Sequence, residues 1–200
     1  MTPHALTLTC NAALLGWVGE IARLTRAREV AWCDGSAAER RQIVASAAMA
    51  GALLSESKRP SHVRRGLPLA SAQGLDRLTF VCTPTRAESG SGSHWMAPSV
   101  AYRKLERLLR DSLGTGTLYV VPDVVDDPAF PQGRVLIELT NSYHGILSMG
   151  VSGRMGREAL DVLGESNAFS RGLHVCLSHA AQHLLVCHFP EDDATWSVSS

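Results

Sequence analysis

Net charge, long apolar runs and paired cysteines are all missing from this 200-residue sequence. Its 19 Lys and Arg residues balance its 19 Asp and Glu residues, so the formal net charge is zero at pH 7. A neutral chain presents no electrostatic surface for nucleic acid or an anionic membrane. No apolar run approaches the ~20 residues of a transmembrane helix. We therefore expect neither nucleic acid nor membrane among its partners.

The cysteine pattern and the first residues bear on the cellular compartment. The 5 cysteines are odd in number and widely spaced, which does not predict a disulfide framework. The first ten residues lack the basic stretch and apolar stretch of a signal peptide. Both observations favour reduced thiols and a cytoplasmic protein. A hydrophobic content of 45% is typical of a folded globular chain.

Several catalytic signatures are also missing. The sequence has no G-x-x-x-x-G-K-[ST] phosphate loop, no G-x-G-x-x-G fingerprint, no nucleophile elbow and no CxxC pair. We expect no cofactor. His179 and His183 have the i, i+4 spacing of a metal-binding pair, but no carboxylate lies between them, and a polar loop with surface histidines is the preferred interpretation. No metal site is predicted.

The sequence does contain the hydrophobic patterns of both helices and strands. The helical spacing of apolar residues predicts helices over 11–25, 37–54, 98–113 and 155–164. Short apolar runs predict strands over 29–33, 78–82, 117–121, 134–140, 145–149 and 184–188. The irregular order favours one α/β (α+β) domain over 1–200, with a mixed β-sheet flanked by helices.

The connecting segments carry two further signals. Ser36 and Glu39 have the spacing of a capping box and predict the start of the second helix. The polar stretch 55–74 is predicted to be an irregular loop of a length that is often functional. Asp123 and Asp126 are predicted to lie in a loop after the strand 117–121.

Eight short strings occur in a characteristic order and spacing along nearly the whole chain. They are W-C-D-G-S at 32–36, K-R-P at 58–60, T-F-V-C at 79–82, H-W-M-A-P at 94–98, L-Y-V-V-P at 118–122, E-L-T-N-S at 138–142, R-M-G at 154–156 and H-F-P-E at 188–191. Together they resemble the N-terminal lobe of the GTP-dependent phosphoenolpyruvate carboxykinase family. The resemblance implies the fold of that lobe.

The departures from the family pattern imply a loss of its activity. The family's manganese ligands, phosphate loop, guanine pocket and lid belong to a nucleotide-binding C-terminal domain beyond the region that these residues match. Within the lobe, the family's substrate-binding arginine falls at Gly74, and another of its arginines falls at Gly150. We therefore expect a naturally short chain without carboxykinase activity, whose site is larger and less cationic.

Candidate catalytic residues follow from the same resemblance. His144 takes the position of a family tyrosine near the substrate cleft, where an imidazole could act as a general acid or base. Asp123 and Asp126 would follow a strand near that cleft, where burial could raise a carboxyl pKa. The alternatives are a hydrogen-bonded structural histidine and solvated loop aspartates. His174 and His188 match family histidines and are expected to serve the fold.

Substrate contacts are predicted at four positions around the altered cleft, namely Arg65, His62, Gly74 and Gly150. The leading hypothesis is a repurposed, cofactor-independent enzyme of the cyclase, isomerase or lyase type that acts on a small molecule in a specialised biosynthetic pathway. Two alternatives stay open. One is a binding or regulatory module that forms a homodimer or docks a partner protein through the former interlobe surface. The other is an inactive, truncated carboxykinase.

Overall fold

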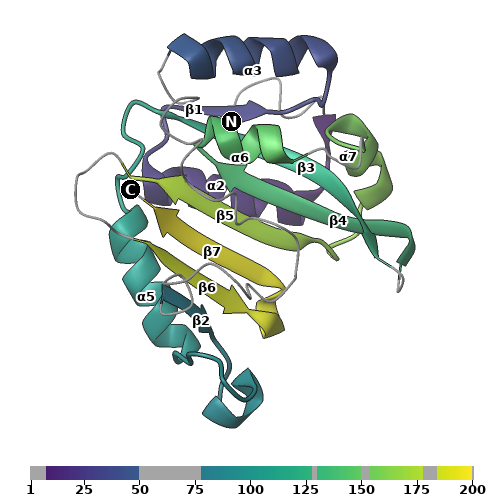
Figure 1. Ribbon diagram of the computed structural model, residues 1–200. Helices are drawn as coiled ribbons and strands as arrows, with labels where there is room; N and C mark the ends of the chain where they lie inside the picture. The colour runs from purple at the N-terminus through teal and green to yellow at the C-terminus, as the bar shows by residue number, and fades with distance from the viewer. Residues whose placement is uncertain (1–7, 50–77, 128–129, 150–153, 178–183, 200) are drawn as a thin grey trace.

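A computed structural model of the chain describes residues 8–49, 78–127, 130–149, 154–177 and 184–199 (Figure 1). Seven strands of this part form one sheet in the order β1-β3-β4-β5-β7-β6-β2. They are β1 Glu29–Trp32, β2 Thr79–Val81, β3 Thr117–Asp127, β4 Phe130–Thr140, β5 Ser170–Cys176, β6 Leu185–Phe189 and β7 Ala194–Ser199. β4, β5 and β7 run parallel, whereas β3 and β6 run antiparallel to their neighbours β4 and β7. The predicted mixed sheet is confirmed.

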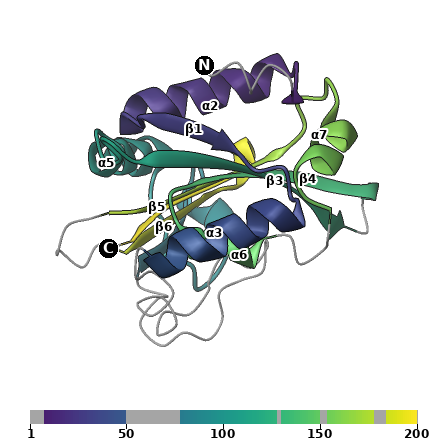
Figure 2. The ribbon, with the colours of Figure 1, turned by 90° about the horizontal axis from the view of Figure 1, so that it is seen from above.

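Helices cover the sheet from both sides (Figure 2). One face carries α2 (Ala12–Thr25), α5 (Pro98–Leu109) and α7 (Arg157–Leu163). The opposite face carries α3 (Ala37–Met49) and α6 (Tyr143–Ser148), which contact each other. The fold is therefore a three-layer α/β arrangement, as expected. None of the described helices is long and apolar enough to span a bilayer.

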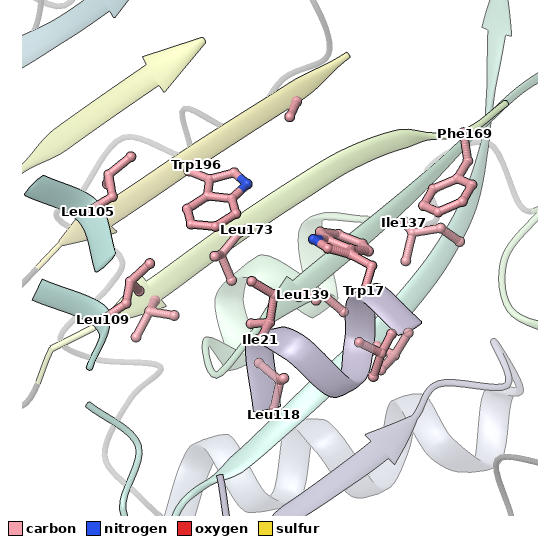
Figure 3. Close-up of a cluster of buried hydrophobic side chains, with 14 of the residues drawn as sticks. Trp17, Ile21, Leu105, Leu109, Leu118, Ile137, Leu139, Phe169, Leu173 and Trp196 are labelled. Carbon is pink, nitrogen blue, oxygen red and sulfur yellow. The ribbon is translucent and has the colours of Figure 1, made fainter. Parts of the chain in front are cut away.

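The main core lies between the sheet and the layer of α2, α5 and α7. Trp17 and Ile21 project from α2 toward Leu139 and Leu173 of the central strands (Figure 3). Side chains alternate between the two faces of a strand, so every second residue of β4, β5 and β7 enters this core. A smaller core lies on the opposite face, beneath α3 and α6, and contains Cys33, Ile43, Val121, Ile146 and Met149.

Local signals specify several elements as predicted. α2, β1, β2 and α7 lie within the segments expected from periodicity, and β6 overlaps its expected segment and ends one residue later, at Phe189. Ser36 Oγ accepts the N–H of Glu39 at 3.0 Å, which confirms the start of α3. The Glu39 carboxylate accepts the N–H groups of Asp34 and Gly35 at 3.1 and 2.9 Å. It reaches past Ser36 because the N–H of Ser36 already donates to Asp34 Oδ1 at 2.6 Å.

Two local predictions were wrong, each for an identifiable reason. The apolar run 145–149 lies in α6 and is not a strand, because Ser142 Oγ accepts the N–H of Gly145 at 3.1 Å and caps a helix. Asp123 and Asp126 lie in β3 and not in a loop. The pairing of β3 with β4 continues past Val121, with Asp123 opposite Leu136, so strand hydrogen bonding overrides the turn propensity of aspartate.

Candidate functional site

Polar side chains line the sheet face opposite the main core, on strands β4, β5, β6 and β7. His174 of β5 lies at their centre. Its Nδ1 is 2.8 Å from Oγ of Ser197, which lies directly opposite in β7. Ser197 Oγ is in turn 3.3 Å from the carbonyl oxygen of Leu173, to which it donates its one hydrogen. In the tautomer in which Ser197 accepts the Nδ1–H of His174, the lone pair of the neutral imidazole is on Nε2.

Glu138 of β4 lies on the same face and is 4% exposed. Its register partner in β5 is Gly172, and a Cβ atom added there would overlap Glu138 Oε2. The missing side chain at Gly172 thus makes room for the carboxyl group to lie across β5. Burial raises the pKa of Glu138 to about 7, and the positive charge of His174 opposes this effect only in part. The carboxyl group therefore exchanges its proton near neutral pH.

Cys176 is the last residue of β5 and lies on the face that carries His174. Its Sγ is 3.5 Å from His174 Nε2 and 3.4 Å from Ser199 Oγ. Asn141 holds its backbone from both sides. The N–H of Cys176 donates to Asn141 Oδ1 at 2.8 Å, and Asn141 Nδ2 donates to the Cys176 carbonyl at 2.9 Å. The thiol thus lies within 3.5 Å of Nε2 of the imidazole.

A cavity of about 480 Å³ opens at this end of the sheet. Its lining is formed by residues that carry no formal charge at neutral pH, namely Ser112, Leu113, Thr115, Gly116, Thr117, Tyr119, Asn141, Tyr143 and Cys176. Burial and a hydrogen bond with Tyr143 raise the pKa of Tyr119 above its ordinary value, so its phenol stays protonated. Ser112 Oγ is buried and finds no hydrogen-bond partner among the described residues. The cavity therefore offers neutral hydrogen-bonding groups.

A second histidine lies farther along the same face. His188 of β6 has its Nδ1 2.9 Å from Oγ1 of Thr195, directly opposite in β7. Burial lowers the pKa of His188 below its ordinary value, which favours the neutral ring. This pair joins β6 to β7 and fits the structural role expected for His188.

The comparison with known proteins identifies the family. The family model of the phosphoenolpyruvate carboxykinase N-terminal domain matches residues 16–200. The chain belongs to this family. Its carboxykinase-type domain is 42% identical to phosphoenolpyruvate carboxykinase [GTP] of Anaeromyxobacter dehalogenans (strain 2CP-C), over 100% of this chain and 34% of that protein. It is 31% identical to the enzyme of the same name from Corynebacterium kroppenstedtii, over 96% of this chain and 33% of that protein.

A third relative of this carboxykinase-type domain is more distant. The phosphoenolpyruvate carboxykinase [GTP] of Neocallimastix frontalis is 28% identical, over 96% of this chain and 31% of that protein. The chain thus spans about a third of the length of the curated relatives that it matches.

Two of the three predicted catalytic residues lie on β3, and the third lies on α6. Asp123 is 3% exposed within β3 and forms an isolated bridge with Met155. Asp126 is exposed at the register irregularity near the end of β3. His144 is half-buried in α6, and its Nε2 is buried without a hydrogen-bond partner among the described residues.

The other predicted positions cannot be placed. His62, Arg65, Gly74 and Gly150 lie outside the described residues, as do His179 and His183. Within the part of the chain that is described, no group of three or more His, Cys, Asp or Glu side chains could hold a metal ion.

Sequence reasoning missed Glu138 and Cys176 and assigned His174 to the fold alone. A signal for Glu138 was present, because it is the one carboxylate in the otherwise apolar run from Val135 to Leu139. His174 and Cys176 are two residues apart, which places them on one face of a strand. Their link to Glu138 depends on the pairing of β4 with β5, which no local pattern indicates.

Proposed function

We propose that these residues form an acid–base site for a small molecule and work without a cofactor. The observation that carries the proposal is Glu138, a buried carboxyl group with a pKa raised to about 7 beside the imidazole of His174. A group that titrates near the working pH can both accept and return a proton. Paired titratable groups of this kind favour a functional site over a purely structural one.

A route for the proton supports the proposal. Glu138 is buried, whereas His174 Nε2 is 3.5 Å from the thiol of Cys176, which lines the cavity. His174 therefore moves a proton at the cavity, and Glu138 stabilises the charged imidazolium that results. A volume of about 480 Å³ is in the range of small-molecule sites.

We also propose that these 200 residues do not transfer a phosphoryl group on their own. Phosphoryl transfer depends on metal ions and cationic side chains around the phosphates. The sequence has no phosphate loop, and glycine stands at 74 and 150 where the family resemblance places arginines. Glycine cannot form the bidentate clamp that a guanidinium gives a carboxylate. Reactions of the isomerase, lyase or cyclase type need only proton transfer and orientation, and they suit a specialised biosynthetic pathway.

Deuterium exchange tests the acid–base chemistry without knowledge of the natural substrate. The purified chain is incubated in D₂O with a panel of small carbonyl compounds, and the loss of their α-C–H signals is followed by proton NMR. We expect exchange faster than in buffer, and its loss in Glu138→Gln. The matched control is Glu106→Gln, an exposed carboxylate on α5, which retains the activity. Equal exchange in the wild-type chain and in Glu138→Gln contradicts the acid–base role.

A second assay tests the absence of phosphoryl transfer. The chain is mixed with GTP, Mn²⁺ and oxaloacetate, the substrates that its relatives' family implies, and phosphoenolpyruvate is measured. We expect none above the enzyme-free background. Its formation overturns this half of the proposal and leaves the acid–base half intact.

A further inference from the structure

The thiol of Cys176 meets two conditions for a nucleophile. It lines the cavity, and it lies 3.5 Å from a ring nitrogen of His174. The hydrogen bonds on the other side of the ring bear on which nitrogen carries the hydrogen. When Ser197 Oγ donates to the Leu173 carbonyl, it accepts from His174 Nδ1. In this tautomer Nε2 faces the thiol as an acceptor, which is the arrangement of a nucleophile and its base.

The backbone around Cys176 is held in place on both sides. Asn141 binds its N–H and its carbonyl oxygen, and the N–H of Leu177 donates to the Ser199 carbonyl at 2.6 Å. Ser199 Oγ lies 3.4 Å from the thiol and 3.5 Å from Nε2. The thiol and the imidazole therefore lie close together in the structure, and β5 need not change its conformation to bring them into contact.

The cavity indicates the class of ligand. Its lining combines hydroxyl, phenol and amide groups and includes no carboxylate and no cationic side chain among the described residues. The hydroxyl groups of Thr115 and Thr117 in this lining can donate a hydrogen bond to a ligand oxygen. These features fit a small, uncharged, polar compound with an acceptor oxygen such as a carbonyl group.

We propose that Cys176 is a nucleophile that His174 activates and that it takes an acyl group from a small neutral ester or thioester in this cavity. The Sγ proton moves to His174 Nε2 as the sulfur attacks the carbonyl carbon, and an S–C bond forms. The bond to the leaving oxygen or sulfur breaks, and the leaving group takes the proton from Nε2. The products are a thioester on Cys176 and a free alcohol or thiol. The neighbouring Glu138 carboxylate stabilises the imidazolium between these two steps.

The inference shares His174 with the proposed function, but it does not require proton exchange on a substrate. Deuterium exchange and thiol alkylation in the wild-type chain separate the two, and Cys176→Ser should keep deuterium exchange. If the wild-type chain exchanges deuterium while the alkylation test below fails, only the nucleophile is refuted. If deuterium exchange fails while the alkylation test succeeds, only the proposed function is refuted.

Alkylation by iodoacetamide tests the thiol, and Cys10 serves as an internal reference because it is exposed and free in the same chain. The rates at the two sites are measured by mass spectrometry of their peptides from pH 6 to pH 9. An ordinary thiol loses reactivity as the pH falls, because the thiolate is the reacting form. A thiol that passes its proton to an imidazole keeps its reactivity. The Cys176 to Cys10 ratio is expected to rise at least about tenfold from pH 9 to pH 6.

Variants of the neighbouring residues test the mechanism. His174→Gln is expected to make the ratio independent of pH, and Ser197→Ala to reduce its rise because Nδ1 loses its acceptor. Ser197→Ala also covers the case in which His174→Gln does not fold. Incubation with p-nitrophenyl acetate is expected to leave an acetyl group on the Cys176 peptide and none on the Cys10 peptide. A ratio that does not change with pH in the wild-type chain, or that still rises in a folded His174→Gln, overturns the proposal.

Discussion

The two faces of β5 differ in chemical character. Leu173 and Val175 are buried in the main core, where α2 and α5 pack against the sheet. The alternating positions carry Gly172, His174 and Cys176, which interact with polar residues on β4 and β7. One face therefore stabilises the fold by excluding water, and the other holds groups that titrate or react. Substitutions one residue apart should thus have effects of different kinds.

The largest effect is expected on the apolar face. Leu173→Ala removes a side chain that is 1% exposed and leaves a cavity in the main core. The free energy of unfolding should fall by about 2–5 kcal/mol. Urea denaturation followed by circular dichroism measures it. The matched control is His174→Gln, the next residue, whose loss should be smaller because its side chain lies outside that core. A larger loss in His174→Gln would reverse the assignment of the two faces.

The second largest effect is expected for Glu138→Gln on the polar face, which should raise the free energy of unfolding by an amount that depends on pH. Because the folded-state pKa of Glu138 is raised from 4.5 to about 7, its penalty is absent below pH 4.5 and complete above pH 7. The wild-type chain therefore loses stability as the pH rises through this window. Glu138→Gln keeps the shape without the charge and should be more stable at pH 8 by up to about 3 kcal/mol.

Denaturation curves at pH 4 and pH 8 measure this difference. The gain from Glu138→Gln should nearly vanish at pH 4, where both side chains are neutral. Glu106→Gln on the exposed side of α5 should show no such dependence. A gain of equal size at both pH values would mean that packing rather than charge distinguishes Glu138 from Gln.

The contrast between the faces also separates what the sequence can predict from what it cannot. Continuous apolar runs indicated β1, β2 and β6, and a 3.6-residue period indicated α2. β5 and β7 were missed because half of their residues are polar. The alternation of Ala194, Trp196 and Val198 with polar residues was nevertheless a strand signal. In α6 a single Ser142 cap decided between helix and strand for an apolar run that fits either.

The candidate site was less predictable than the fold for a physical reason. Glu138 and Gly172 are neighbours only through the register of two parallel strands, and that register results from the packing of the whole sheet. A local sequence pattern can predict which side chains share one face of a strand, but it cannot predict which side chains of different strands become neighbours. The family resemblance indicated the substrate cleft and His144 as the candidate site. The buried carboxyl group of Glu138 and the thiol of Cys176 lie instead in β4 and β5, to which the resemblance assigned no catalytic residue.

The third prediction tests the fit between Glu138 and Gly172. In Gly172→Ala the new methyl group overlaps the Glu138 carboxyl group, and forced repacking of this kind costs about 1–3 kcal/mol. Adding Glu138→Ala removes the obstacle, so the double variant should regain much of the loss that Gly172→Ala causes in the wild-type background. A double-mutant cycle from urea denaturation measures the coupling.

The control for this cycle is Gly16→Ala. Gly16 lies in α2, and a Cβ added there has no atom within 4 Å. This substitution should stabilise the chain slightly, by about 0.5–1 kcal/mol, because alanine is the better helix former. Additive effects of Gly172→Ala and Glu138→Ala would show that the glycine is not required by the carboxyl group.

The smallest effect is expected at His188, and its sign relative to pH separates it from Glu138. Burial lowers the folded-state pKa of His188 below 6.5, so the unfolded chain binds the proton more readily. Stability is therefore lost as the pH falls below 6.5, whereas Glu138 causes a loss as the pH rises from 4.5 to about 7. The two effects overlap between pH 4.5 and pH 6.5, where His188→Gln should remove a rise of stability with pH and Glu138→Gln should remove a fall. Thermal melts at half-unit intervals from pH 4 to pH 8 distinguish the two. A change on the neutral side in His188→Gln would mean that the two groups titrate together and that the polar face is one coupled network reaching from β4 to β6.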